Sequence, residues 1–250
     1  MSASSEGRKD SGTFPRVVFE LSKQPTDTSC GPTCLHGVYR FYGDEMPLEQ
    51  VIAEVPALEE GGTLAVNLGT HALKRGYNAR LCTFNLAVFD PTWFEDGKFC
   101  RLDRLKASLE FRRGRKLRQA IKAYIDFVER GGRIQMVDLN ASLLRKFLKR
   151  KQPILSGLSS TYLYQTSREI PSNCQDDDLM GEPAGHFVVV SGYDSDEKRA
   201  EVVDPFVDNP LGDAQRYMVS LDRLITAILL GVLTYDANLL VIEKRGTASH

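Results

Sequence analysis

The stretch that decides the fold is Gln-Pro-Thr-Asp-Thr-Ser-Cys-Gly-Pro-Thr-Cys-Leu, at residues 24–35. Its first half, residues 24–29, combines Pro, Asp, Thr and Ser, which are typical of turns. Residues 30–42 predict a helix, because apolar side chains follow one another at steps of three and four residues. They are Leu35, Val38, Tyr39 and Tyr42. The sequence therefore places Cys30 at the N-terminus of a helix that faces a core, with Ser29 as the expected N-cap. The helix dipole at this end favours an anionic side chain.

The rest of the chain divides into a helical first half and a strand-rich second half. Helices are predicted at residues 47–55, 63–74, 102–110, 116–130, 141–150 and 221–230. Apolar and β-branched runs between turns predict strands. These runs lie at residues 16–21, 77–84, 153–158, 186–193, 199–203, 215–220 and 238–243. This order predicts an α+β fold, in which an N-terminal helical layer packs on a C-terminal antiparallel sheet.

The overall composition is that of a soluble globular protein. The chain has 250 residues, of which 42% are hydrophobic and 26% charged, with a formal net charge of -1. A balanced charge provides no field to attract nucleic acid or an anionic membrane. The longest apolar stretch, residues 224–233, is too short to cross a bilayer. We therefore expect no nucleic-acid partner and no membrane partner. The sequence gives no indication of the oligomeric state.

The cysteines and histidines do not have the spacing of a disulfide framework or a metal site. Five cysteines are scattered along the chain, and an odd number in a chain of this length is not typical of disulfide-stabilised proteins. Cys30 and Cys34 lie four residues apart, but no second pair of ligands follows at the spacing of a zinc site. We therefore expect no metal and no organic cofactor.

A histidine and an aspartate complete a candidate thiol site. His186 begins the apolar strand predicted at residues 186–193, where an imidazole is out of place unless its ring is used. Asp204 ends the next predicted strand, directly before Pro205. A hairpin between the two strands would bring Asp204 beside His186. A thiol nucleophile needs a base beside it, a group that orients the base, and donors for the oxyanion.

These motifs resemble those of a known family. Residues 24–35, together with Gly-His-Phe-Val-Val at 185–189 and Val-Asp-Pro-Phe at 203–206, resemble the bacteriocin-processing peptidases that remove double-glycine leaders. That family belongs to the papain-like cysteine peptidases. The resemblance implies a papain-like α+β fold and a thiol hydrolase that cleaves a peptide or amide bond without a cofactor.

The resemblance also implies a role for each residue of the motifs. Cys30 matches the nucleophile, His186 the base and Asp204 the residue that orients it. Gln24 precedes Cys30 by six residues, and in this family its side chain and the backbone N–H of the cysteine form the oxyanion hole. The substrate that these roles imply is a peptide or an amide.

The resemblance further predicts how the chain is organised. Residues 14–246 are expected to form a single papain-like peptidase domain. A helical insertion is expected near residues 86–135, a stretch longer than a minimal peptidase of this kind needs. Residues 1–13 are expected to be a disordered tail. The beginning of the chain is polar and lacks the apolar run of a secretory signal, so a cytoplasmic location is predicted.

Several alternatives stay open at the level of sequence. The same site would serve an acyl or peptidyl transferase if an amine or a second peptide, and not water, resolved the acyl-enzyme. The chain could also be a catalytically silent binding module on a papain-like fold. The acidic run at residues 176–178 is either a solubilising loop or a rim that attracts a cationic peptide or an amine.

Overall fold

A computed structural model describes residues 16–58, 61–212 and 214–246. The predicted disordered tail at residues 1–13 lies outside these ranges. None of the helices in the described part of the chain has the length and apolar character needed to span a membrane.

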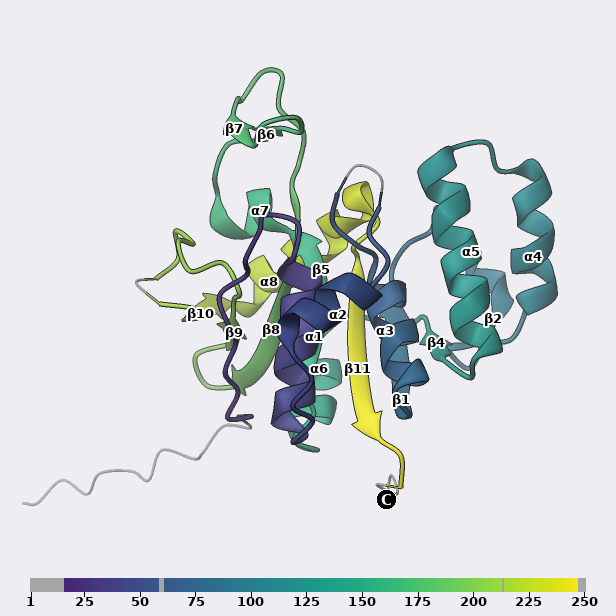
Figure 1. The fold of residues 1–250 in the computed structure, drawn as a ribbon, viewed down its shortest axis with the longest axis horizontal. Helices are drawn as coiled ribbons and strands as arrows, with labels where there is room; N and C mark the ends of the chain where they lie inside the picture. Colours follow the sequence, from purple (N-terminus) through teal and green to yellow (C-terminus); the bar gives the residue numbers. More distant parts are fainter. Residues whose placement is uncertain (1–15, 59–60, 213, 247–250) are drawn as a thin grey trace, which may run out of the picture.

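The fold centres on one large sheet, as Figure 1 shows. Its strand order is β10-β9-β8-β5-β11-β1-β4-β3-β2. The strands are β1 (Tyr77–Thr83), β2 (Phe94–Glu95), β3 (Lys98–Phe99), β4 (Arg133–Gln135), β5 (Ile154–Ser159), β8 (Gly185–Asp194), β9 (Arg199–Val203), β10 (Arg216–Ser220) and β11 (Asn238–Lys244). Every pair of neighbours is antiparallel except β1 and β4. A separate two-stranded sheet joins β6 (Glu169–Ile170) and β7 (Gln175–Asp176).

Helices cover both faces of the sheet. They are α1 (Cys30–Phe41), α2 (Leu48–Glu54), α3 (Ala65–Lys74), α4 (Leu102–Phe111), α5 (Arg115–Glu129), α6 (Ala141–Leu148), α7 (Ser160–Tyr164) and α8 (Leu221–Leu230). Figure 1 shows α1 in front of the sheet, with α6 and α8 behind it. Strand β5 is therefore buried along its whole length. The predicted α+β fold, with helices of the N-terminal half packed on a mainly antiparallel sheet, is confirmed.

Two predictions about the strands were wrong in part. Residues 16–21 were expected to form a strand, but only Arg16 makes a β-bridge, to Gly192. Strand β5 pairs with residues 185–190 of β8, so the segment meets β8 only beyond the end of β5, where Ser191 accepts a hydrogen bond from the Val17 N–H at 2.7 Å. The remainder of this segment is held by side chains, including that of Arg216, which donates to the Phe19 carbonyl.

The predicted separation of helices and strands along the chain was also too strict. Strands β1 to β4 all come from the first 135 residues, and β4 pairs with β1 in parallel. Strands β2, β3 and β4 have two or three residues each, too few for an alternating pattern to stand out in the sequence. They extend the sheet beyond the strands that the C-terminal half provides.

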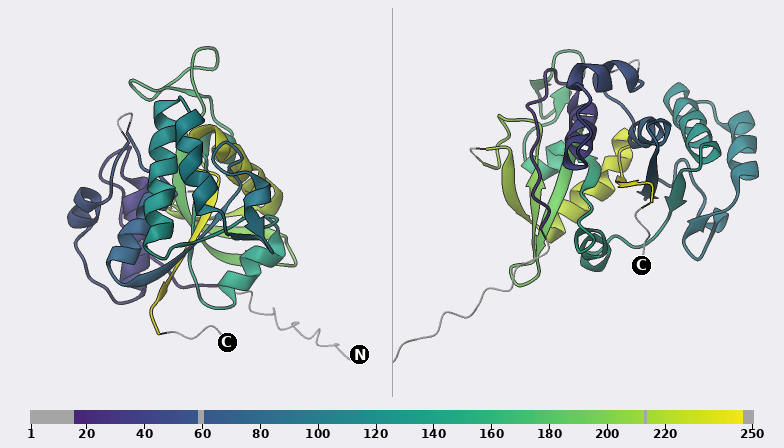
Figure 2. Two further views of the ribbon diagram at one scale, coloured as in Figure 1. Left: turned by 90° about the vertical axis from the view of Figure 1, so that its right-hand side faces the viewer. Right: turned by 60° about the horizontal axis from the view of Figure 1, so that its bottom comes forward.

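Helices α4 and α5 make up half of residues 86–135, where an insertion is predicted. They pack against each other, and α5 also packs against α3, at one side of the molecule (Figures 1 and 2). The contact centres on Phe127, which is fully buried. A Cβ atom added at Gly69 or Gly132 would lie 2.7 Å or 2.5 Å from the Phe127 ring, so both glycines make room for it.

We expect Phe127→Ala to lower the free energy of unfolding by about 3–5 kcal/mol, because it would leave a cavity between α5 and α3. Urea denaturation followed by circular dichroism would measure the change. Phe111→Ala is the matched control on the neighbouring helix. Phe111 is 76% exposed, so its loss should change the stability by less than about 0.5 kcal/mol. Equal effects of the two substitutions would contradict this account of how the helical hairpin is held.

Candidate active site

Cys30 is the first residue of α1, as predicted, and a hydrogen-bonded turn leads into it. Ser29 occupies the N-cap position, but its hydroxyl does not cap the helix. The Ser29 hydroxyl donates instead to the Thr26 carbonyl at 2.8 Å, and accepts from the Thr26 N–H at 3.0 Å. This closes the turn that precedes Cys30. The polar residues of this stretch therefore fix the backbone at Cys30 and leave the helix N-terminus without a side-chain cap.

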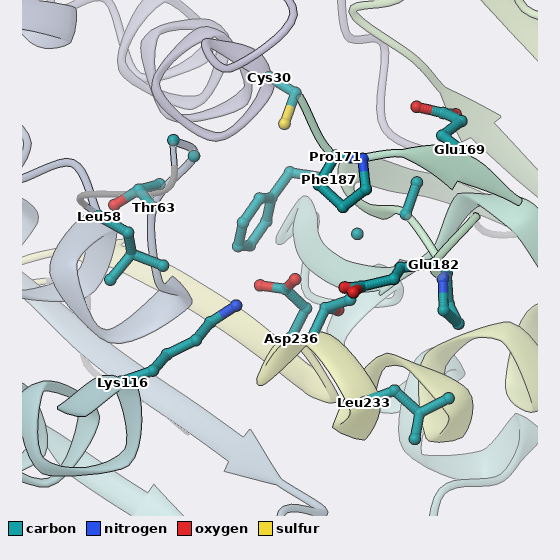
Figure 3. Close-up of a pocket in the computed structure, with 16 residues that line it drawn as sticks. Cys30, Leu58, Thr63, Lys116, Glu169, Pro171, Glu182, Phe187, Leu233 and Asp236 are labelled. Atoms are coloured by element: carbon teal, nitrogen blue, oxygen red, sulfur yellow. The ribbon is translucent and has the colours of Figure 1, made fainter. Parts of the chain in front are cut away.

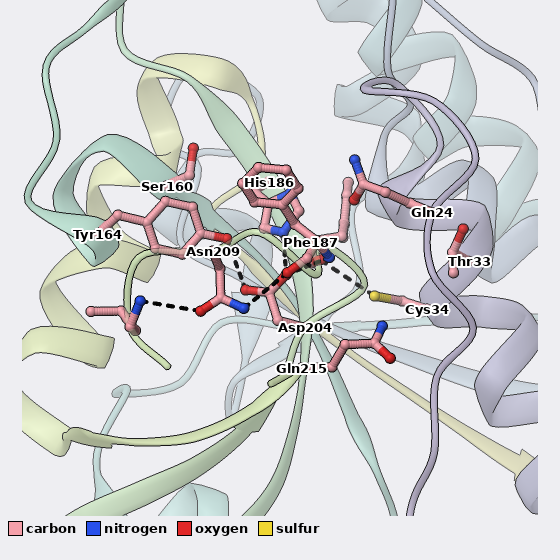
Figure 4. Close-up of polar contacts among 12 residues, drawn as sticks. Gln24, Thr33, Cys34, Ser160, Tyr164, His186, Phe187, Asp204, Asn209 and Gln215 are labelled. Carbon is pink, nitrogen blue, oxygen red and sulfur yellow. Dashed lines mark hydrogen bonds and ion pairs between the residues drawn. The ribbon is translucent and has the colours of Figure 1, made fainter. Parts of the chain in front are cut away.

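Strands β8 and β9 bring His186 and Asp204 together. Val189 of β8 lies opposite Val203 of β9, so Asp204, which directly follows β9, lies diagonally across from His186. The His186 Nε2 atom lies 2.8 Å from Asp204 Oδ1 (Figure 4). The hairpin inferred from the sequence is present, and it joins the imidazole to the carboxylate.

The carboxylate of Asp204 is fully buried and receives four hydrogen bonds. Besides His186, the Phe206 N–H donates to Oδ1 at 2.9 Å. The Tyr164 hydroxyl donates to Oδ2 at 2.8 Å (Figure 4). The Tyr217 hydroxyl donates to the same oxygen at 2.8 Å. Burial raises the pKa of Asp204, but the charge of His186 and the hydrogen bonds outweigh it and hold the pKa below its ordinary value. Asp204 is therefore an anion at neutral pH, fixed from four sides.

His186 is buried between Asp204 and Cys30. Burial lowers the pKa of His186, but the charges of Asp204 and Cys30 and hydrogen bonds with both side chains raise it, to about 10. An unperturbed histidine titrates near 6.5. The imidazole in this site is therefore protonated at neutral pH. Because Asp204 takes Nε2, the other ring nitrogen is the one available to Cys30.

Gln24 lies beside this group, although its amide is only partly satisfied. Its backbone N–H donates to the Pro205 carbonyl at 3.0 Å, which ties it to the end of the β8–β9 hairpin. The Nε2 atom donates to the Thr26 carbonyl at 3.1 Å, while Oε1 is buried with no hydrogen-bond partner among the described residues. Figure 4 shows the side chain directed toward His186. All four residues singled out in the sequence thus lie in one region of the fold.

The other cysteines lie in different environments. All five are free thiols. Cys34, one helical turn after Cys30, is buried and donates to the Phe187 carbonyl at 3.3 Å. Burial, with the charges of Cys30 and Asp204, raises the pKa of Cys34 well above its ordinary value, as expected of a core residue. Cys100 and Cys174 are exposed, and desolvation followed by nearby carboxylates raises the pKa of each.

A cleft of about 290 Å³ opens beside the nucleophile position. Cys30 lines it, together with residues of the loop before α3, of β8 and of the segment before β11. Figure 3 shows the Cys30 thiol, the Lys116 ammonium and the Asp236 carboxylate pointing into the same space. Phe187 and Leu58 give the cleft apolar walls, so a side chain with an apolar stem could enter it.

The acidic run at residues 176–178 lies on the β6–β7 hairpin and its following turn, which project from the body of the fold (Figure 1). The Asp177 carboxylate accepts hydrogen bonds from the N–H groups of Leu179 and Met180, both at 2.8 Å. None of the three aspartates is among the described residues that line the cleft. Asp176 pairs in register with Glu169, which does line it, so a role at the rim stays a prediction.

Sequence reasoning missed three residues of this region. Tyr164 lies on α7, a helix of five residues that is too short to show periodicity. Tyr217 lies at a buried position of β10, whose residues alternate in burial, but nothing in the sequence indicates that its hydroxyl bonds to Asp204. Asp236 stands in a Tyr-Asp-Ala-Asn stretch that has the composition of a turn. Only the register of distant strands brings these side chains to the site.

In the described ranges there is no group of three or more His, Cys, Asp or Glu side chains that could hold a metal ion.

Comparison with solved structures finds similarity to peptidases. A double-glycine-motif protease from an AMS/PCAT transporter, in complex with the leader peptide, is 14% identical over 92% of this chain and 94% of its own, with a TM-score of 0.44. A Bacillus anthracis protein named as a C39-like peptidase is 14% identical over 92% and 98%, with a TM-score of 0.47. Xylellain, a cysteine protease from Xylella fastidiosa, is 14% identical over 92% and 85%, with a TM-score of 0.41. The sequence matches no protein-family model, and no curated protein matches it.

Proposed function

We propose that this chain is a papain-like cysteine peptidase that hydrolyses a peptide or amide bond through an acyl-enzyme. The observation that carries the proposal is the placement of the buried His186, which is bonded to Asp204 on one side and lies beside Cys30 on the other. An imidazolium beside a thiol favours the thiolate, which is the nucleophile in thiol chemistry. The position of Cys30 at a helix N-terminus favours the same form.

In the first half of the proposed reaction, the sulfur of Cys30 attacks the carbonyl carbon, and the carbonyl π pair moves onto oxygen. Gln24 and the Cys30 backbone N–H donate to this oxyanion, because the first N–H groups of a helix have no partner within it. The second hydrogen of the Gln24 amide serves here, since the first is bonded to Thr26. When the oxyanion collapses, the C–N bond breaks and His186 gives its proton to the leaving amine.

In the second half, water resolves the thioester. The now neutral His186 removes a proton from water as the water oxygen attacks the acyl carbon. Collapse breaks the C–S bond, releases the carboxylic acid and regenerates the pair of Cys30 and His186. Asp204 holds the ring in one orientation and stabilises its protonated form throughout, because four donors fix its carboxylate. The substrate is a peptide or an amide, and the predicted location is the cytoplasm.

The test of this proposal is the reactivity of each cysteine toward iodoacetamide, read by peptide mass spectrometry at pH values from about 6 to 9. We expect Cys30 to react at least about tenfold faster than Cys100 and Cys174 at the lower end of this range. These two are exposed but have raised pKa values, so they serve as internal controls. In His186→Ala the advantage of Cys30 should disappear.

Peptide cleavage is measured on the same proteins with a library of internally quenched peptides. Wild type should cleave members of the library, and Cys30→Ala should cleave none. If Cys30 reacts no faster than the other thiols and no peptide is cleaved, the chain is a silent binding module and the proposal fails. If product forms only when an amine acceptor is added, the same site belongs to a transferase.

A further inference from the structure

Asp236 lies at the floor of the cleft beside Cys30 and is not used in the mechanism above. It is 7% exposed, and its Oδ1 atom is buried with no hydrogen-bond partner among the described residues. Leaving a carboxylate oxygen buried and unpaired costs free energy, and such groups in proteins are usually paired. Figure 3 shows this carboxylate directed into the cleft. A partner from outside the chain would satisfy it.

The surrounding backbone is shaped to seat this carboxylate. A Cβ atom at Gly185 would lie 2.4 Å from Asp236 Oδ2, and one at Gly157 would lie 2.9 Å from Asp236 Cβ. Both positions flank the site, since Gly185 directly precedes His186 and Gly157 lies on the neighbouring strand β5. The Asp236 backbone N–H is bonded to the Gly231 carbonyl at 2.7 Å, which anchors the residue without using Oδ1. The aspartate is therefore held in place by its backbone, with its side chain aimed at the cleft.

The charges that line the cleft are mainly negative. Among the described residues, Glu169 and Glu182 line it together with Asp236, against a single lysine, Lys116. The Lys116 ammonium also lies over the Tyr235 ring, 5.6 Å from its centroid. Burial raises the pKa of Asp236 to about 7, although a hydrogen bond from Thr234 and the charges of Lys116 and His186 lower it. Burial, followed by the charges of Asp176 and Asp27, also raises the pKa of Glu169. A cation that entered the cleft would relieve both carboxylates.

We propose that this cleft is a specificity pocket for a cationic side chain of the substrate, such as that of lysine or arginine, with Asp236 as its main anionic contact. The apolar walls of Phe187 and Leu58 would pack on the methylene stem, and the charged end would reach the buried carboxylate. The statement that a substrate side chain binds here rests on the proposed function. The preference of the cleft for cations does not depend on that function, because it can be measured from the rate at which reagents modify the Cys30 thiol.

The experiment compares two thiosulfonate reagents of similar size, aminoethyl methanethiosulfonate and sulfonatoethyl methanethiosulfonate. Each transfers its thioalkyl group to Cys30 and releases methanesulfinate. The rates are measured by mass spectrometry at about pH 8, where Asp236 is ionised, and are divided by the rates with glutathione. We expect the cationic reagent to be favoured in wild type, and the ratio to fall about tenfold in Asp236→Asn.

Two further variants provide a change in the opposite direction and a matched control. Lys116→Met removes the positive charge that competes for Asp236, so the ratio should rise above that of wild type. Asp222→Asn is the matched control, because it makes the same change of charge at an exposed position on α8, outside the cleft. Its ratio should equal that of wild type. A ratio that does not respond to Asp236→Asn or to Lys116→Met would overturn the inference.

Matched peptides then separate this inference from the proposed function. Lysine and norleucine have the same apolar stem, and only lysine carries the ammonium. If peptides are cleaved, those with lysine should be preferred at one position, and Asp236→Asn should reduce the ratio of kcat/KM values about tenfold. Cleavage without any such preference would overturn the pocket and leave the peptidase intact. A reagent ratio that responds to Asp236 in a protein that cleaves nothing would leave the pocket and overturn the peptidase.

Discussion

Asp204→Ala is expected to abolish peptide cleavage and to lower the free energy of unfolding by roughly 3 to 5 kcal/mol. The carboxylate is fully buried and accepts hydrogen bonds from two tyrosine hydroxyls, one backbone N–H and His186. Alanine would leave all four donors without their acceptor, and the protonated imidazole would be buried without its counter-charge. Urea denaturation gives the loss of stability, and the iodoacetamide assay gives the loss of Cys30 reactivity.

Two conservative variants serve as controls for this prediction. Tyr164→Phe and Tyr217→Phe each remove one hydroxyl donor and keep the ring, while three donors to Asp204 remain. Each should cost about 1 kcal/mol and retain most of the reactivity of Cys30. Their effects should not simply add in the double variant, because both hydroxyls bond to the same oxygen. An Asp204→Ala protein as stable as Tyr164→Phe would show that the carboxylate does not organise this network.

The elements that carry the predicted site could be located from the sequence because their signals are local. Helix α1 has apolar residues at helical spacing, and β8 is a continuous apolar run that is closed by a turn and followed by β9. A short hairpin fixes which residues of two strands are neighbours. The proximity of His186 and Asp204 could therefore be inferred from the amino-acid sequence alone.

What could not be predicted depends on contacts between distant segments. Tyr217 reaches Asp204 only because β10 pairs with β9, and Tyr164 does so from a five-residue helix after β5. Asp236 lies in the cleft because β11 is placed between β5 and β1 in the sheet. In the sequence this aspartate looks like an ordinary turn residue. Strand β5 occupies β8 at residues 185–190, so residues 16–21 make one β-bridge and no strand, and this too has no local signal.

The stability of the protein is expected to fall on both sides of a window of pH, and the two limits come from the same ion pair. The pKa of Asp204 is lowered in the folded state, so its contribution is present above the ordinary value near 3.9 and is lost as the pH falls through the lower folded value. The pKa of His186 is raised to about 10, so its contribution is complete below about 6.5 and is lost as the pH rises through about 10.

His186→Gln isolates the alkaline limit, because glutamine retains an N–H donor for Asp204 but does not titrate. Wild type and His186→Gln are both compared in the Cys30→Ser background, so that the thiol beside the imidazole does not titrate. Ionisation of the remaining cysteines and of the tyrosines in the unfolded chain lowers both stabilities equally and cancels in the difference. We expect this difference in unfolding free energy to be largest below about pH 6.5 and to shrink, by on the order of 3 kcal/mol, toward about pH 10. A difference that stayed constant across this range would mean that His186 is not held as a cation in the folded protein. The proton that the leaving amine needs would then have to come from another group.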